Sequence, residues 1–192
     1  MKSSNFYVGN FLDFKTGLLR QYNEKRICKL SEMKEMYRDK EVVDDLLKLG
    51  KDRIIYEFYS VLASSKEGHL QYGLCIIYPG KIALEYHMTK GHFHIPKETA
   101  EIYIGLKGRG YLIMQTEDGY FSKIEMTPGV ISYIPPSWAH RVINVGTEKL
   151  MFFAVCPSNI KHNYDFFKQK GFSKIVVEKN NKPTFIDNMR LK

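Results

Sequence analysis

The sequence predicts a protein made mainly of β-strands, folded as an antiparallel sandwich or barrel with a helical and strand extension before it. Two observations support this prediction. From residue 54 onward, short runs rich in Ile, Val, Tyr and Phe follow one another, and turn-forming pairs such as Pro79-Gly80 and Pro128-Gly129 separate them. Before residue 54, apolar residues recur near helical spacing instead. Many short strands at regular spacing are typical of an all-β architecture.

The strands expected in the barrel lie at residues 55–63, 70–78, 82–89, 101–107, 109–116, 120–126, 130–134, 141–145 and 149–156. Residues 30–49 are predicted to be helical, because apolar residues recur there near helical spacing and Gly50 can end a helix. Asp39 could begin a second helix, so two shorter helices are an alternative. After the barrel we expect a short helix at 165–169 and two more strands at 174–178 and 184–187.

The chain shows no repeat, low-complexity tract or linker, so we expect residues 1–192 to form a single domain. Its barrel core is expected at about 54–157, with the N-terminal extension at 1–53 and the C-terminal helix and strands at 158–192. A chain of 192 residues can bury a full hydrophobic core without disulfides or a structural metal.

Charge and cysteine usage restrict the partners and the compartment. The formal net charge is +8, yet the lysines and arginines are spread along the chain rather than gathered into a basic run with interleaved aromatics. We therefore expect no nucleic-acid partner, whereas a small anionic substrate fits this charge. No apolar run is long enough to span a bilayer, and the N-terminus lacks the apolar stretch of a signal peptide. We therefore expect no membrane partner. Because Cys28, Cys75 and Cys156 show no paired spacing, we also expect a cytoplasmic protein with reduced thiols.

Three histidines and one glutamate offer the most specific chemistry in the chain. His92 and His94 are two residues apart, so on a strand both side chains point to the same face. Glu101 follows the turn indicated by Pro96 and is expected to begin the next strand, facing back across a hairpin. His140 is expected on a later strand that barrel closure brings near. Three neutral imidazoles and a carboxylate suit a divalent transition metal and leave two positions for water or substrate oxygens.

The same segment resembles the cupins, a superfamily of jelly-roll barrels also described as double-stranded β-helices. The second cupin motif, G-x5-P-x-G-x2-H-x3-N, is matched by Gly129, Pro135, His140 and Asn144, with Ser137 in place of the second glycine. The first motif has three or four residues between its HxH pair and the glutamate, whereas six separate His94 from Glu101 here. That longer gap resembles the cupin-type glucose-6-phosphate isomerases, which are the archaeal-type phosphoglucose isomerases.

Further strings across the chain look like the same family. They are YPGK (78–81), TKGHFH (89–94), AEIYIGLKGRG (100–110), PPSWAHRVIN (135–144) and GFSKIVVE (171–178). The resemblance therefore covers nearly the whole chain. TKGHFH together with PPxWAH is specific to this group, whereas a cupin barrel alone hosts many chemistries.

The resemblance implies a metal-dependent isomerase that interconverts glucose 6-phosphate and fructose 6-phosphate. It implies His92, His94, Glu101 and His140 as ligands of one divalent metal per subunit, with iron expected first and manganese, nickel or zinc as alternatives. Glu101 is implied as the base, with Tyr103 and His140 as its catalytic neighbours. The residues implied in binding the substrate and its phosphate are Thr89, Gly91, Tyr56, His162 and Tyr164. A homodimer is expected by analogy with other small cupins.

Several alternatives stay open at this point. The hydrogen could move as a proton through a metal-chelated cis-enediolate, or as a hydride, and these residues are compatible with both. Cys75 stands where the resembled family is expected to have a threonine, and Cys156 where it often has a tyrosine. Either the substrate affinity is altered, or the phosphate is held from elsewhere, with Lys90 and Tyr164 as candidates. A cupin dioxygenase can use a similar set of ligands, and a cupin that binds a sugar phosphate without catalysis is a third interpretation.

Overall fold

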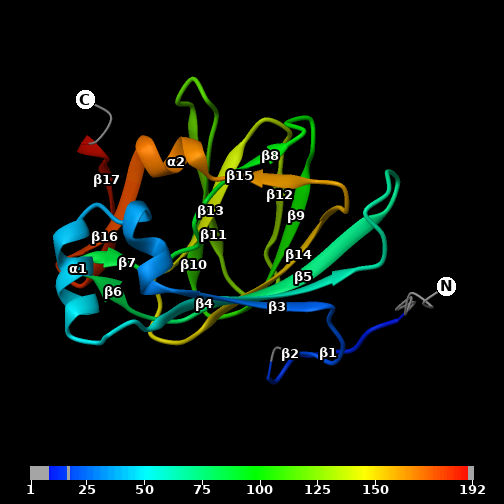
Figure 1. Ribbon diagram of the computed structural model, residues 1–192, viewed down its shortest axis with the longest axis horizontal. Helices are drawn as coiled ribbons and strands as arrows, with labels where there is room; N and C mark the ends of the chain where they lie inside the picture. The colour runs from blue at the N-terminus through cyan, green and yellow to red at the C-terminus, as the bar shows by residue number, and fades with distance from the viewer. Residues whose placement is uncertain (1–8, 17, 190–192) are drawn as a thin grey trace.

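The computed structural model describes residues 9–16 and 18–189, and two antiparallel sheets that face each other form its centre (Figure 1). In order across the larger sheet lie β12 (Ile131–Ile134), β9 (Glu101–Lys107), β14 (Leu150–Pro157), β5 (Leu70–Ile77), β4 (Ile54–Leu62) and β3 (Glu24–Lys29). The smaller sheet has β11 (Phe121–Met126), β10 (Gly110–Gln115) and β13 (Ala139–Asn144). The chain crosses between the two sheets from β9 to β10 and at each step from β11 to β14, as in a jelly roll, without closing into one continuous barrel. The expected all-β cupin fold is confirmed.

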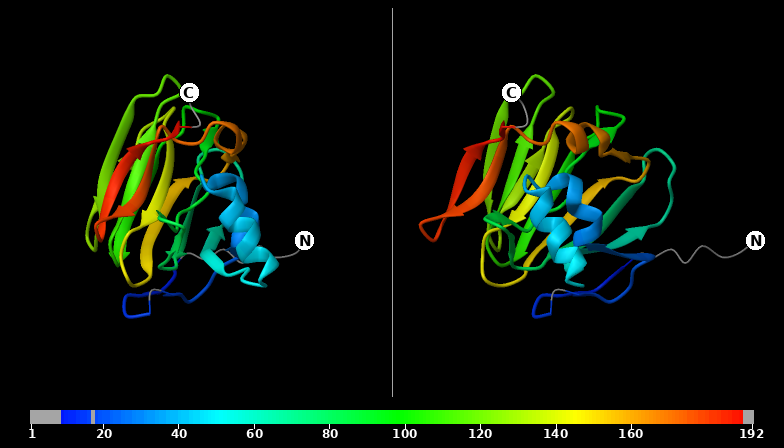
Figure 2. Two further views of the ribbon diagram at one scale, coloured as in Figure 1. Left: turned by 90° about the vertical axis from the view of Figure 1, so that its left-hand side faces the viewer. Right: turned by 60° about the vertical axis from the view of Figure 1, so that its left-hand side comes forward.

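Three smaller sheets extend this centre. They are β15 (Lys161–Asn163) with β8 (Phe93–Ile95); β17 (Lys182–Asp187), β16 (Lys174–Lys179), β7 (Glu85–Tyr86) and β6 (Lys81–Ile82); and β1 (Leu12–Asp13) with β2 (Leu18–Leu19). β16 and β17 lie along the outside of the three-stranded sheet (Figure 2), where the ring of Phe185 contacts Tyr111 and the ammonium of Lys123. The C-terminal strands therefore cover a face that would otherwise expose apolar residues.

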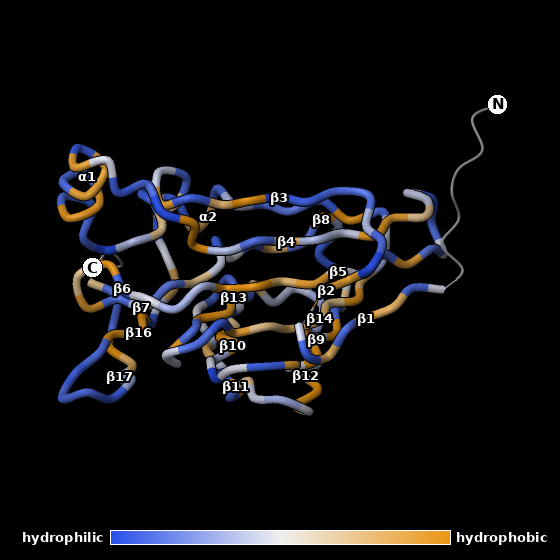
Figure 3. The backbone as a smooth tube through the Cα atoms, turned by 90° about the horizontal axis from the view of Figure 1, so that it is seen from below, coloured by the Kyte–Doolittle hydropathy of each residue, from blue (hydrophilic) through white to orange (hydrophobic). Residues whose placement is uncertain are grey.

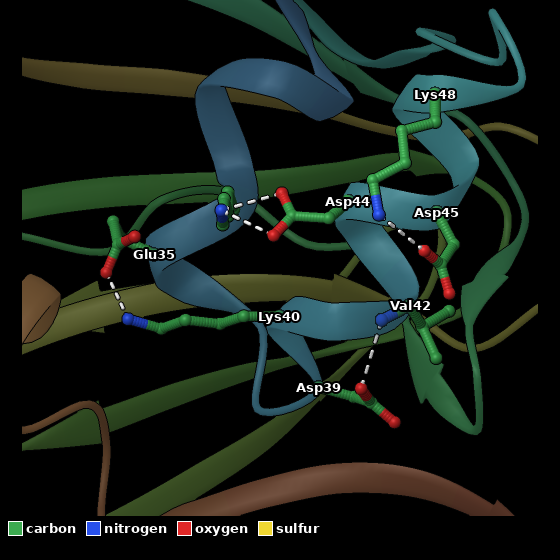
Figure 4. Close-up of polar contacts among 8 residues, drawn as sticks. Glu35, Asp39, Lys40, Val42, Asp44, Asp45 and Lys48 are labelled. Atoms are coloured by element: carbon green, nitrogen blue, oxygen red, sulfur yellow. Dashed lines mark hydrogen bonds and ion pairs between the residues drawn. The ribbon is translucent and has the colours of Figure 1, made fainter.

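The predicted helix at 30–49 is divided into two, η1 (Leu30–Met36), a 3-10 helix, and α1 (Lys40–Lys48). Asp39 causes the restart, because its carboxylate accepts a hydrogen bond from the Val42 N–H at 3.2 Å and so caps α1. Ion pairs between Lys34 and Asp44 and between Lys40 and Glu35 join the two helices (Figure 4). The alternative of two shorter helices is confirmed. The short helix expected at 165–169 is α2 (Asp165–Gln169).

Most of the core lies between the sheets and beneath the helices. Phe167 of α2 stacks on Phe172 with ring centroids 4.1 Å apart and on Phe93 at 5.5 Å, so α2 is held against β8. A second, smaller cluster lies on the opposite face of the six-stranded sheet, where the β1–β2 hairpin covers it with Leu12 and Leu19. Hydrophobic stretches follow β5 and β14 in the middle of that sheet (Figure 3). These strands are buried on both faces, which explains their near-continuous apolar sequence.

The strand expected at 82–89 is wrong in its extent. It is divided into β6 and β7 by a turn in which Ala83 has a φ of 49°, a left-handed conformation that ends the extended chain. The remaining expected barrel strands are present within one or two residues of their predicted bounds. None of the helices in the described part of the chain has the length and apolar character needed to cross a membrane.

Candidate metal centre

Four ligand atoms from three segments of the chain meet between the two sheets. His92 immediately precedes β8, His94 lies within β8, Glu101 begins β9 and His140 lies in β13. One ligand atom from each residue lies within 4.8 Å of the other three. Oε2 of Glu101 is 3.0 Å from Nε2 of His140 and 3.3 Å from Nε2 of His94. The structure therefore brings together the four residues that the sequence singled out.

Backbone pairing places two of these histidines. The His92 N–H donates to the His140 carbonyl at 3.3 Å, and the His140 N–H donates to the His92 carbonyl at 3.1 Å. This bridge adds the segment before β8 to the edge of the three-stranded sheet. β8 itself pairs with β15, not with β9, so the expected hairpin between His94 and Glu101 is absent. The longer gap between these two residues lets the chain pass from one sheet to the other instead.

Hydrogen bonds leave the inward nitrogen of His94 available. Its Nδ1 lies 3.2 Å from the Thr99 carbonyl oxygen, an acceptor, so Nδ1 carries the proton and Nε2 has a free lone pair. Nε2 of His92, His94 and His140 and Oε2 of Glu101 are all buried and make no well-formed hydrogen bond with the described residues. Leaving four converging buried atoms without partners is costly. A divalent metal bound by all four would satisfy them, so the residues fit such an ion.

The protonation states also fit a metal. Burial, followed by the positive charge of His140, His162 and His94, holds the pKa of His92 well below its ordinary value. Burial alone would raise the pKa of Glu101, but the nearby imidazoles of His140 and His94, 3.0 and 3.3 Å from its Oε2, outweigh burial and hold that pKa at about 2. Near neutral pH His92 is therefore a neutral imidazole and Glu101 is ionised. Metal ligands must be in these deprotonated forms.

A cavity of about 240 Å³ opens onto two of these ligands, His92 and Glu101. It far exceeds the space of about 10–15 Å³ that one water needs. Residues expected to contact the substrate all lie on its wall: Tyr56, Thr89, Gly91, Tyr103, His162 and Tyr164. Arg26, Ser60 and Gln71 also line it and were not predicted. Arg26 comes from β3, whose exposed and charged sequence shows no alternation that could have revealed a strand.

His162 is placed over the metal ligands by the short β15–β8 ladder, in which it is the register partner of His94. Its ring lies 4.1 Å, between centroids, from the ring of His92. Desolvation by the neighbouring side chains, acting against the attraction of Glu101, lowers the pKa of His162 to about 4, although part of the residue is exposed. This side chain is therefore a neutral group at the mouth of the cavity near neutral pH.

The segment 89–91 is held in one conformation beside the ligands. The Thr89 N–H donates to the Val142 carbonyl at 2.9 Å, and the Val142 N–H donates to Thr89 Oγ1 at 3.1 Å. The Thr89 hydroxyl thus keeps its own hydrogen to donate. Gly91 has a φ of 76°, and a Cβ there would lie 2.6 Å from the Phe172 ring and 3.0 Å from Nε of Arg141. Both the conformation and the space require glycine.

Thiols and one phenol surround the Glu101 carboxylate. All three cysteines are free and buried, and Cys75 lines the cavity. Burial, and then the charge of Glu101, raises the pKa of Cys156. Burial and then the charge of Glu101 also raise the pKa of Tyr103, which lies two residues further on the same face of β9. These groups remain protonated near neutral pH and act as hydrogen-bond donors rather than nucleophiles.

The sequence matches the family "Glucose-6-phosphate isomerase (GPI)" over residues 27–188. The chain belongs to the glucose-6-phosphate isomerase family. Members from Thermococcus litoralis and Thermococcus kodakarensis are 43% and 40% identical to it, over 92% and 96% of this chain and 92% and 96% of their own lengths. A putative glucose-6-phosphate isomerase 2 from Rhizobium meliloti is 30% identical over 86% of this chain and 83% of its own. An oxalate decarboxylase of Bacillus subtilis with Mn(II) centres matches 53% of the chain, and 26% of its own, at 21% identity and a TM-score of 0.45.

Proposed function

We propose that this chain interconverts glucose 6-phosphate and fructose 6-phosphate at a divalent metal held by His92, His94, Glu101 and His140. One observation carries the proposal: the four ligand atoms converge beside a cavity in a chain of the glucose-6-phosphate isomerase family. We expect Fe²⁺ first, with Mn²⁺, Ni²⁺ and Zn²⁺ as alternatives, because imidazole and carboxylate ligands suit all four. When bound, such an ion supplies Lewis-acid polarisation of the sugar carbonyl.

Glu101 is our candidate for the group that moves the proton between C1 and C2 of the sugar. Its Oε2 faces His94 and His140, so the other carboxylate oxygen, Oε1, is the atom proposed to take up and return the proton. The buried hydroxyl of Tyr103 lies beside this carboxylate, and its ring is 5.6 Å from that of His140. We assign Tyr103 the role of donating a hydrogen bond as negative charge develops on the sugar oxygens.

The phosphate is proposed to bind at the segment 89–91, through the Thr89 hydroxyl and the Gly91 N–H. Both groups face the same cavity as the metal ligands. Tyr56 and Tyr164 would add hydroxyl groups, and His162 would contact the sugar between the phosphate and the metal. A cytoplasmic enzyme with a single domain over residues 1–192 is in keeping with this role.

The polar groups on the cavity wall bear on the alternatives. A dioxygenase would be favoured by a wholly apolar lining, whereas here Thr89, Gln71, His162 and several tyrosines share the wall with Phe58, Phe152 and Cys75. A protein that binds sugar phosphate without catalysis would use the same wall, and only turnover separates it from an isomerase.

We further propose a homodimer formed through the outer face of β9 and β12. Ile102, Ile131 and Tyr133 are exposed there, side by side in the β9–β12 ladder. A neighbouring group of exposed apolar side chains is a feature of interaction surfaces. Light scattering after gel filtration tests this: the chain should elute at twice its mass, and Ile131→Glu should elute as a monomer.

The isomerase proposal is tested by incubating the metal-loaded protein with fructose 6-phosphate and identifying the product. We expect glucose 6-phosphate as the product, and we expect it to form equally fast when dioxygen is removed. Binding of fructose 6-phosphate without any product, with each of the four metals in turn, would instead support the non-catalytic alternative. Oxygen consumption coupled to product formation would support the dioxygenase.

A further inference from the structure

Two cations on the cavity wall have no role among the substrate contacts assigned above. Arg26 of β3 and Lys90, which lies between Thr89 and Gly91, both line the cavity wall. Each is in contact with the same carboxylate: Glu32 Oε2 lies 3.5 Å from Nζ of Lys90 and 3.8 Å from Nη2 of Arg26. The Glu32 carboxylate therefore lies between two cations on the wall that also carries Thr89 and Gly91, and Glu24, two residues before Arg26 on β3, is a second carboxylate on that wall.

We propose that Arg26 and Lys90 grip the phosphate of the substrate, and that Glu32 is an internal counterion which this phosphate displaces. The inference rests on the proposed function, which supplies the phosphorylated substrate. It adds two charged residues to the phosphate contacts proposed for the neutral Thr89 and Gly91. It also implies that Glu32 lowers the affinity of the site for the phosphorylated substrate.

The contact distances indicate that Glu32 is held loosely by the two cations. Charge-assisted N–H···O hydrogen bonds are usually about 2.7–2.9 Å long. At 3.5 and 3.8 Å neither contact of Glu32 reaches that range. The Glu32 side chain is also 41% exposed, so water screens its charge. Lys90, in contrast, is only 13% exposed, and a largely buried ammonium gains more from a strong anionic partner.

A phosphate is the stronger competitor for these cations. It carries a charge of about −1.5 to −2 and three acceptor oxygens, against one oxygen of Glu32. A guanidinium such as that of Arg26 can bind two oxygens of one phosphate at once. Arg26 also lies against the hydroxyl of Tyr164, which contributes to the same wall. Hydrogen-bond donors from β3 and from the segment 89–91 would therefore contact the same phosphate.

Displacement of Glu32 needs little rearrangement of the chain. Its other oxygen, Oε1, accepts a hydrogen bond from the Lys29 N–H at 3.2 Å and helps to begin η1. Rotation of the Glu32 side chain, which is 41% exposed, is enough to move Oε2 away from the two cations. The 3-10 helix does not have to unfold for the substrate to enter.

The experiment measures binding of inorganic phosphate and of fructose 6-phosphate to the metal-loaded protein by calorimetry at low ionic strength. The variants are Arg26→Gln, Glu32→Gln and, as a matched control, Glu35→Gln. Glu35 lies on the same 3-10 helix but pairs with Lys40 of α1 (Figure 4), and neither residue lines the cavity. Gln at position 32 can still accept from the Lys29 N–H, and Arg26 is half exposed on an edge strand, so all three variants should fold.

We expect Arg26→Gln to weaken both ligands by about tenfold, the value of one charge-assisted hydrogen bond. Glu32→Gln should tighten both ligands several-fold, because it removes the competitor, and Glu35→Gln should leave both unchanged. The affinity for unphosphorylated fructose should be the same in the unmodified protein and in all three variants. Unchanged phosphate binding in Arg26→Gln, or weaker binding in Glu32→Gln, would overturn the inference. Since inorganic phosphate cannot be isomerised, a failure of the isomerase proposal alone would leave the differences in its affinity in place.

Discussion

Nε2 of His140 lies 3.0 Å from Oε2 of Glu101, and this contact joins the two sheets of the molecule. Glu101 begins β9 of the six-stranded sheet, whereas His140 lies in β13 of the three-stranded sheet. His92 and His94 approach the same point from the segment that crosses between them. The candidate metal centre therefore depends on how the sheets face each other, and the metal would in turn hold the sheets together.

Replacing Glu101 by Gln should reduce kcat by about 10²–10⁴-fold, because the amide keeps the shape of the side chain but cannot act as a base. The same reaction in D2O should carry solvent deuterium into the sugar carbon in the unmodified protein. Mass spectrometry of the product measures this directly. A product free of deuterium would favour the hydride shift and would reduce Glu101 to a metal ligand.

Thr89→Val should raise KM for fructose 6-phosphate by about tenfold, since it removes one donor to a charged phosphate. The variant also loses the acceptor for the Val142 N–H, which is 3.1 Å from Thr89 Oγ1, so a modest loss of stability is expected as well. Steady-state kinetics and a thermal melt separate the two effects. Thr89→Ser keeps the hydroxyl and should restore KM; if the Val variant itself shows an unchanged KM, Thr89 does not contact the phosphate.

His87 should make the stability of the protein depend on pH. Burial, and then the charge of Arg53, lowers its pKa from 6.5 to about 4 despite a hydrogen bond to the Tyr78 carbonyl. Between these pH values the unfolded chain binds the proton and the folded chain does not. Stability is therefore fully present above about pH 6.5 and is lost as the pH falls toward 4, by at most about 3 kcal/mol.

Urea denaturation of metal-free protein at pH 7 and pH 5 measures this loss. His92 and His162 also have lowered pKa values and contribute in the same window, so the comparison is made with His87→Asn. That variant should lose less stability between the two pH values than the unmodified protein. Equal losses would show that His87 is not the group responsible.

The strands of the centre could be predicted from the sequence because they alternate or run continuously apolar and end at glycine or proline turns. β9 was predicted at its observed bounds, residues 101–107. β3 could not be predicted, since most of its residues are exposed and charged and only pairing with β4 makes it a strand. β8 and β15 are three residues each, too short for a periodic pattern, and tertiary pairing alone defines them.

The four candidate ligands were predictable because their spacing and the family motif both single them out. The cavity wall was predictable only where the family resemblance reached, at residues such as Thr89 and Tyr103. Arg26 and Glu32 lie in the extension before the barrel, and no local pattern connects them with the histidines. Their place beside Lys90 follows from the way β3 and η1 pack against the barrel, which only the structure shows.

The most direct test of the metal centre follows activity and metal content in one preparation. The protein is stripped with a chelator, reloaded in steps with Fe²⁺ or another of the four metals, and assayed for conversion of fructose 6-phosphate at each step. Activity should be absent without metal, should rise in proportion to the metal bound, and should stop rising at one ion per chain, with His140→Ala binding at least about 100-fold more weakly. Full activity in the stripped protein, or undiminished metal binding in His140→Ala, would contradict the account.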